Sequence, residues 1–180
     1  MNNIPLKSDP RAAIWLLDSL EVMRVLGVKV LLVAQFHKGE LKGDAPGIDR
    51  TVDVLKAVAP RAEKSGMILG LENYLSAEEN LRIMERVGSR AVQVYYDVGN
   101  STDKGYGIYR EIRLLKGQIC EFHFKDAGFL LGQGRIDFAK VRDAIEEIGF
   151  TGWAQIEAAA PKDLILDYQA NLKYLRGLFA

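Results

Sequence analysis

The chain has 180 residues, of which 48% are apolar and 27% charged, a balance typical of one globular domain with a buried core. Basic and acidic residues number 24 each, so no excess of positive charge favours binding to nucleic acid. The single cysteine cannot form an internal disulfide, and no stretch approaches the roughly 20 apolar residues of a membrane span. We therefore expect one cytoplasmic domain over residues 1–180 that binds neither nucleic acid nor membranes.

Helices and short apolar strands alternate along the first half of the chain. Ser8-Asp9-Pro10 is a helix-start signal, and the predicted helix ends at Gly27. The apolar run over 28–34 then predicts a strand buried on both faces, as in a parallel sheet. After a polar loop, the sequence predicts a helix over 49–65, a strand over 67–73 and a helix over 76–88 that opens with a capping box.

The second half continues the alternation. It predicts a strand over 91–97, a loop over 98–105, a helix closed by Gly117, a strand over 119–126, a glycine-rich loop over 127–136, a helix capped by Asp137, a strand over 152–158 and a terminal helix from Pro161. Helix-ending glycines recur about every 30 residues along the chain. A (β/α)8 barrel of about 250 residues has roughly 31 residues per unit.

This spacing predicts an α/β fold of the (β/α)8 TIM-barrel type, with parallel strands and helices on the outside. Only about five of the eight strands are visible, so the predicted barrel is incomplete. Two explanations stay open. The missing units precede the chain in a longer protein, or a second copy covers the open sheet edges in a homo-oligomer.

Polar side chains follow or end four successive predicted strands. They are Glu72, Asp97, His123 and Glu157, separated by 25, 26 and 34 residues. Because the carboxyl ends of barrel strands open on one face, we expect these side chains to converge. Three carboxylates and one imidazole suit a divalent cation such as Mn²⁺, with Mg²⁺, Co²⁺ or Zn²⁺ as alternatives. Any one of these four residues alone could instead cap a helix or lie in water. For His37, the other histidine of the chain, we expect exposure to solvent.

The polar residues belong to a series of short motifs. These are Leu71-Glu72-Asn73, Asp97-Val98-Gly99-Asn100, His123-Phe124-Lys125-Asp126, Gly132-Gln133-Gly134 with Asp137-Phe138, and Gln155-Ile156-Glu157. Their order and spacing resemble the metal-dependent sugar isomerase and epimerase barrels of the xylose isomerase-like superfamily, especially the ketose 3-epimerases. The resemblance implies that Glu72, Asp97, His123 and Glu157 bind the metal and that Glu72 and Glu157 also exchange protons. We expect the substrate to be bound by Asn73, Asn100, Lys125 and Arg135.

This reading gives a chemical hypothesis. A proton beside a ketone becomes acidic enough to leave when a cation stabilises the developing enediolate oxygen. Two carboxylates on opposite faces of one carbon could remove a proton from one face and return it to the other, which would invert that centre in a ketose or ketose phosphate. If proton transfer took place on one face only, the enzyme would interconvert aldose and ketose instead. A dehydratase on the same scaffold and a non-catalytic partial barrel stay open as alternatives. A nuclease of the endonuclease IV type is disfavoured, because its metal cluster needs several histidines and this chain has two.

Overall fold

The computed structural model describes residues 4–179. Its contacts divide the chain into two compact units, Met1–Tyr95 and Tyr96–Ala180, and each unit is described by itself. Strand β3 (Val92–Asp97) begins in the first unit and ends in the second. A single domain over the whole chain stays a prediction.

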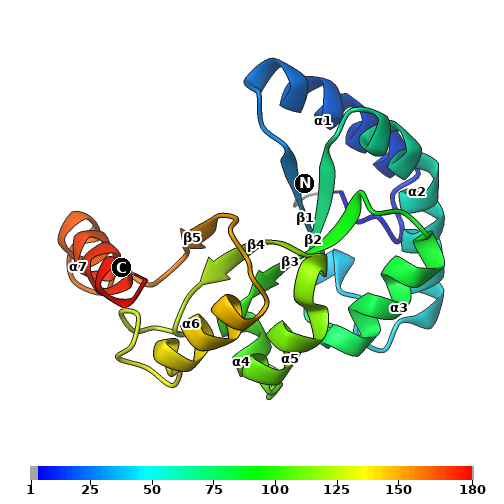
Figure 1. The fold of residues 1–180 in the computed structure, drawn as a ribbon. Helices are drawn as coiled ribbons and strands as arrows, with labels where there is room; N and C mark the ends of the chain where they lie inside the picture. Colours follow the sequence, from blue (N-terminus) through cyan, green and yellow to red (C-terminus); the bar gives the residue numbers. More distant parts are fainter. Residues whose placement is uncertain (1–3, 180) are drawn as a thin grey trace. The chain divides into compact units, whose positions relative to one another are not determined.

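The first unit is a parallel sheet with helices. Its elements are α1 (Ala12–Leu26), β1 (Val30–Ala34), a short 3₁₀ helix (His37–Gly39), α2 (Ala45–Lys64), β2 (Ile68–Glu72), α3 (Ala77–Val87) and the first part of β3 (Figure 1). Strand β1 pairs with β2 and β2 with β3, in parallel, with Ala34 opposite Glu72 and Leu71 opposite Val94. This register brings the carboxyl ends of the three strands to the same edge of the sheet.

Local signals set the helix ends in the first unit. Helix α1 ends at Gly27, whose φ of 71° is in the left-handed region that favours glycine. The predicted capping box is present at α3, where Ser76 and Glu79 each accept a backbone N–H from the other. Helix α2 begins at Ala45, four residues before the predicted start, because the Asp44 side chain caps its first turn.

The second unit continues the alternation. Its elements are the end of β3, α4 (Val98–Asp103), α5 (Ile108–Leu115), a 3₁₀ turn (Lys116–Gln118), β4 (Ile119–Phe124), α6 (Phe138–Glu147), β5 (Ala154–Ile156) and α7 (Leu164–Leu178) (Figure 1). Strands β4 and β5 pair in parallel, with His123 opposite Gln155. Phe122, Phe124 and Phe138 are almost fully buried and form the centre of the core.

Residues 4–179 thus contain five strands, each parallel to the strands that it pairs with in its unit, and helices alternate with them. The predicted incomplete (β/α)8 barrel with about five parallel strands is confirmed. The predicted loop over 98–105 is wrong, because this segment contains α4. None of the helices in residues 4–179 combines the length and apolar character needed to cross a membrane.

Candidate metal centre

Asp97 is the last residue of β3 and also the residue that caps α4. Its Oδ1 atom accepts hydrogen bonds from the backbone N–H groups of Gly99 and Asn100, both at 2.8 Å. The residue is 4% exposed. Because Oδ1 is held by the backbone, the orientation of the carboxylate is fixed and Oδ2 is left to face its neighbours.

His123 and Glu157 lie beside Asp97 in the second unit. His123 is the fifth residue of β4 and is 8% exposed, between two buried phenylalanines whose side chains alternate with its own. Glu157 directly follows β5, and its backbone N–H donates to the carbonyl of Phe124. Asp97, His123 and Glu157 each offer one ligand atom, and these atoms lie within 4.8 Å of one another. Three of the four predicted ligands therefore converge within one unit.

Lys125 neutralises part of the negative charge of this cluster. Its Nζ atom lies 2.9 Å from Asp97 Oδ2 and 2.6 Å from Glu157 Oε2. Burial alone would raise the pKa of Glu157, but the hydrogen bond and charge of Lys125 outweigh it and lower that pKa. Burial alone would lower the pKa of Lys125, but the charges of Asp97 and Glu157 raise it. Both partners are therefore ionised at neutral pH.

Gly99 makes room for the Lys125 side chain. A Cβ atom at this position would lie 2.0 Å from Lys125 Cγ, 2.8 Å from Cδ and 3.0 Å from the Lys125 carbonyl oxygen. Since real side chains do not approach so closely, only glycine allows Lys125 to reach the two carboxylates.

We expect Gly99→Ala to lower the free energy of unfolding by about 1–3 kcal/mol, because the methyl group overpacks the site and displaces the Lys125 stem. Urea denaturation measures the loss. In a Lys125→Ala background the same substitution should cost much less, since the two closest atoms, Lys125 Cγ and Cδ, are gone. Gly117→Ala is the control, because a Cβ there meets nothing within 4 Å. Equal costs of Gly99→Ala in both backgrounds would contradict the contact.

Glu72 is the fourth predicted ligand and belongs to the first unit. It ends β2 and is 3% exposed, and its carbonyl accepts the backbone N–H of Gln35 at 2.8 Å. The next residue, Asn73, uses its side-chain amide locally. Asn73 Oδ1 accepts the N–H of Leu75 at 2.9 Å, and Nδ2 donates to Asn80 Oδ1 at 2.9 Å. These bonds shape the turn that leads from β2 to α3.

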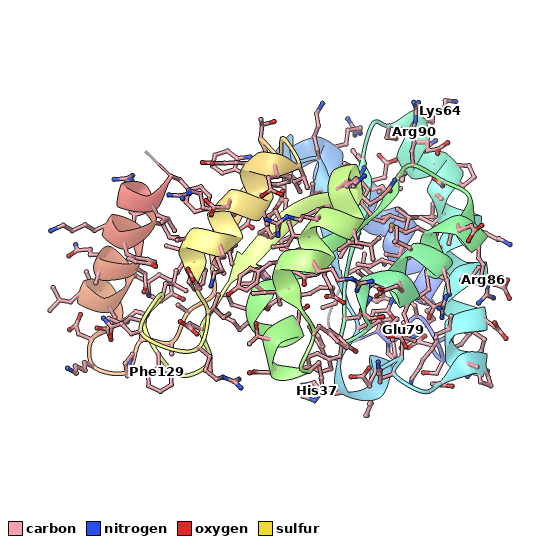
Figure 2. The ribbon with its side chains drawn as sticks, turned by 60° about the horizontal axis from the view of Figure 1, so that its bottom comes forward. His37, Lys64, Glu79, Arg86, Arg90 and Phe129 are labelled. Carbon is pink, nitrogen blue, oxygen red and sulfur yellow. The ribbon has the colours of Figure 1, made fainter. Side chains whose placement is uncertain are left out.

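The other residues predicted to contact the substrate have different surroundings. Asn100 is half-buried in the first turn of α4. Arg135 has a side chain that is 62% exposed and forms an ion pair with Asp103 at the end of α4. His37 is exposed, as the sequence predicted (Figure 2).

Asp126 organises the glycine-rich loop, a role that no pattern in the sequence predicts. The residue is 1% exposed, and its two oxygens accept backbone N–H groups from Gly132, Gly134, Arg135 and Ile136 at 2.8–3.2 Å. A Cβ atom on Gly134 would lie 2.3 Å from Asp126 Oδ1. The loop N–H groups are therefore used inside the protein. The loop turns outward at Phe129, whose side chain is 53% exposed (Figure 2).

Asp126→Asn is expected to lower the free energy of unfolding by about 1–3 kcal/mol, because the amide nitrogen cannot accept the N–H groups that one oxygen accepts now. Urea denaturation is the measurement. Asp103→Asn is the matched control, since its carboxylate is 49% exposed and pairs with Arg135 at the surface, where such a pair contributes about 0–1 kcal/mol. Similar effects of the two substitutions would show that the loop does not depend on Asp126.

The strand order, the helical crossovers and the polar residues at the strand ends define a class of protein. Residues 5–178 match the Xylose isomerase-like TIM barrel family, and the chain belongs to that family.

Two relatives whose names describe epimerases are similar in sequence. The chain is 31% identical over 106 residues to 2-epi-5-epi-valiolone 7-phosphate 2-epimerase of Actinoplanes sp., a match that covers 58% of this chain and 39% of that protein. It is 25% identical over 142 residues to the probable L-ribulose-5-phosphate 3-epimerase UlaE of Mycoplasma pneumoniae, covering 76% of this chain and 42% of that protein. The chain thus spans about two fifths of the length of these relatives.

A solved structure shares the fold. D-psicose 3-epimerase from Clostridium cellulolyticum H10, determined with D-tagatose, is 21% identical with a TM-score of 0.82. The match covers 97% of this chain and 74% of that one. The likeness supports the partial barrel described above.

Proposed function

We propose that the chain belongs to a metal-dependent sugar or sugar-phosphate isomerase or epimerase, with epimerisation of a ketose at C3 as the specific reaction. The observation that carries the proposal is the convergence of Asp97, His123 and Glu157, whose ligand atoms lie within 4.8 Å of one another. Relatives whose names describe epimerases of phosphorylated sugars or cyclitols support the class of substrate.

The donor set fits a divalent cation. Two carboxylate oxygens and one imidazole nitrogen suit Mn²⁺ best, with Mg²⁺, Co²⁺ and Zn²⁺ as alternatives. Asp97 would offer Oδ2, which pairs with Lys125 in this structure, because Oδ1 is held by two backbone N–H groups. Glu72 would supply the fourth ligand from the carboxyl end of β2, since β2 and β3 run in parallel in register. When bound, the cation would stabilise negative charge that develops on a substrate oxygen.

Glu157 and Glu72 are the residues proposed to transfer protons to and from the substrate. The Glu157 carboxylate is ionised at neutral pH, the form that accepts a proton. Its side chain is 49% exposed, so an incoming substrate can reach it. Glu72, on a different strand, would return a proton from the other face and so invert the carbon.

Lys125, Asn100, Asn73 and Arg135 are proposed to contact the substrate. Lys125 has the strongest support, because its ammonium group lies against two of the proposed ligands. Asn100 can add a neutral donor from the first turn of α4. Asn73 also holds the turn after Glu72 through its bond to Leu75. Arg135 would have to leave Asp103 to reach the substrate, and breaking an exposed ion pair of this kind costs little free energy.

The test is incubation of the purified chain with Mn²⁺ in D₂O and a panel of ketoses and ketose phosphates. Deuterium at C3 together with formation of the epimer is the expected result. Label at C1 or C2 would identify an aldose–ketose isomerase instead, and loss of water from the substrate would identify a dehydratase. Mn²⁺ binding is measured separately on the same sample. A folded protein that binds Mn²⁺ but labels no substrate would overturn the epimerase and isomerase assignments.

A further inference from the structure

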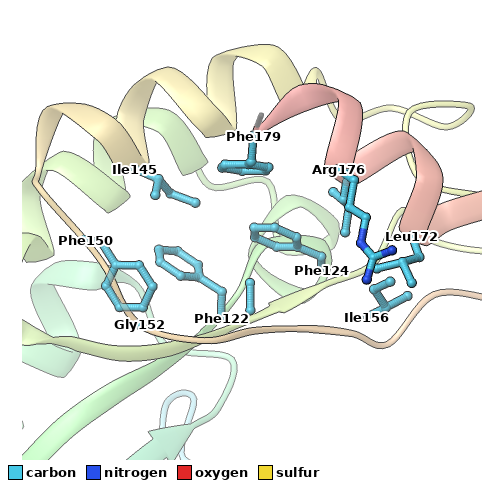
Figure 3. Close-up of a pocket in the computed structure, with 11 residues that line it drawn as sticks. Phe122, Phe124, Ile145, Phe150, Gly152, Ile156, Leu172, Arg176 and Phe179 are labelled. Atoms are coloured by element: carbon cyan, nitrogen blue, oxygen red, sulfur yellow. The ribbon is translucent and has the colours of Figure 1, made fainter.

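A pocket of about 540 Å³ opens in the second unit on the side of β4 that faces away from His123. Its walls come from β4, β5, α6, α7 and the segment between α6 and β5 (Figure 3). Successive side chains of a strand point to opposite faces, so Phe122 and Phe124 face the pocket while His123 faces the metal centre. The pocket is therefore separate from the proposed active site.

Four phenylalanine rings belong to the wall. The Phe122 and Phe150 rings meet edge to face with centroids 4.9 Å apart, and the Phe124 and Phe179 rings stack with centroids 6.0 Å apart (Figure 3). Gly152 makes room for the Phe150 ring, because a Cβ at that position would lie 2.4 Å from the ring. Such a surface favours a flat or aliphatic apolar group, and the volume is in the range of about 300–1,000 Å³ found for small-molecule sites.

Arg176 of α7 is the one charged residue among those that line the pocket. Within residues 4–179 it has no acidic partner, and its guanidinium group is turned toward Ile156 and Leu172 (Figure 3). A guanidinium beside an apolar wall matches a ligand that carries an apolar body and an oxyanion, because its N–H groups bind a carboxylate in two places.

We propose that this pocket binds a small carboxylate with an aromatic or short aliphatic body, the body against the apolar wall and the carboxylate on Arg176. The proposal does not depend on the function proposed for the metal centre. The charge of Arg176 selects an anion over a neutral molecule of the same shape, and the apolar wall favours a ligand with an apolar body.

The probes are 2-naphthoate and 2-naphthamide, which share one apolar body and differ in charge. Isothermal titration with the complete chain should show binding of 2-naphthoate in preference to the amide. Arg176→Met should weaken 2-naphthoate binding about five- to tenfold, the loss expected for one partly exposed charge-assisted contact, and leave the amide unchanged. Lys173→Met, on the same helix but outside the pocket, is the matched control and should change neither.

A second variant tests the location. Ala154→Leu places extra carbon atoms at the floor of the pocket and should weaken both probes, while the melting temperature shows that the chain remains folded. Equal affinity for the acid and the amide, an unchanged affinity in Arg176→Met, or absence of binding at the solubility limit of 2-naphthoate would each overturn the proposal. Mn²⁺ binding is measured on the same sample, so that a failure of the pocket proposal can be told apart from a failure of the proposed metal centre.

Discussion

Glu157→Gln is expected to slow deuterium exchange at the substrate carbon by about 10²–10⁴-fold, the usual contribution of a general base. Glutamine has nearly the same shape but cannot take up a proton. The rate is measured by NMR in D₂O at Mn²⁺ concentrations that saturate the variant, so that weaker metal binding does not lower the rate.

The matched control for this substitution is Glu121→Gln. Glu121 is a half-buried carboxylate in β4 whose Oε2 accepts a hydrogen bond from Gln155 at 2.6 Å, and it is not among the three converging ligands. It should retain the exchange rate of the unaltered protein. If Glu157→Gln also retained that rate under saturating metal, the proposed role of Glu157 as a base would be wrong.

Asp97→Asn is expected to weaken Mn²⁺ binding by at least about 100-fold. The substitution removes one negative charge and a hard oxygen ligand. Replacing only a residue that hydrogen-bonds to a metal ligand typically lowers the metal affinity about 10–100-fold, so loss of a ligand itself should cost at least as much. The side-chain carbonyl of asparagine can still cap α4, so the fold should be retained. Titration of Mn²⁺ followed by electron paramagnetic resonance measures the free ion directly.

Asp137→Asn is the control for Asp97→Asn. Asp137 caps α6 as Asp97 caps α4, since its Oδ1 accepts the backbone N–H groups of Ala139 and Lys140. It is not part of the metal cluster, and its replacement should leave the Mn²⁺ affinity unchanged. Equal losses in the two variants would trace the effect to helix capping and would refute metal ligation by Asp97.

The features that the sequence could predict depend on neighbours along the chain. The glycine that ends α1, the capping box of α3 and the cap of α6 by Asp137 are all signals contained within a few residues, and the structure confirms them. The apolar run that predicted a strand over 119–126 is likewise local, and β4 occupies Ile119–Phe124.

The features that the sequence did not reveal depend on partners that are distant along the chain. Helix α4 is an exception, because its cap Asp97 is adjacent in the sequence, but the glycine, serine and aspartate of residues 98–105 favour a loop by composition. The contact between Gly99 and Lys125 joins the first turn of α4 to the residue that follows β4, and these meet only after folding. The four bonds to Asp126 likewise require the loop to close on a residue six to ten positions earlier.

The cap that Asp97 forms on α4 has a consequence for its proposed role as a metal ligand, which concerns how fast a cation can be captured. Two backbone N–H groups already hold the carboxylate in one rotamer, so the side chain loses little conformational entropy when an ion arrives. The carboxylate would therefore not have to change its orientation when the ion binds. The slow step in loading would then be the departure of the Lys125 ammonium from its two carboxylate partners.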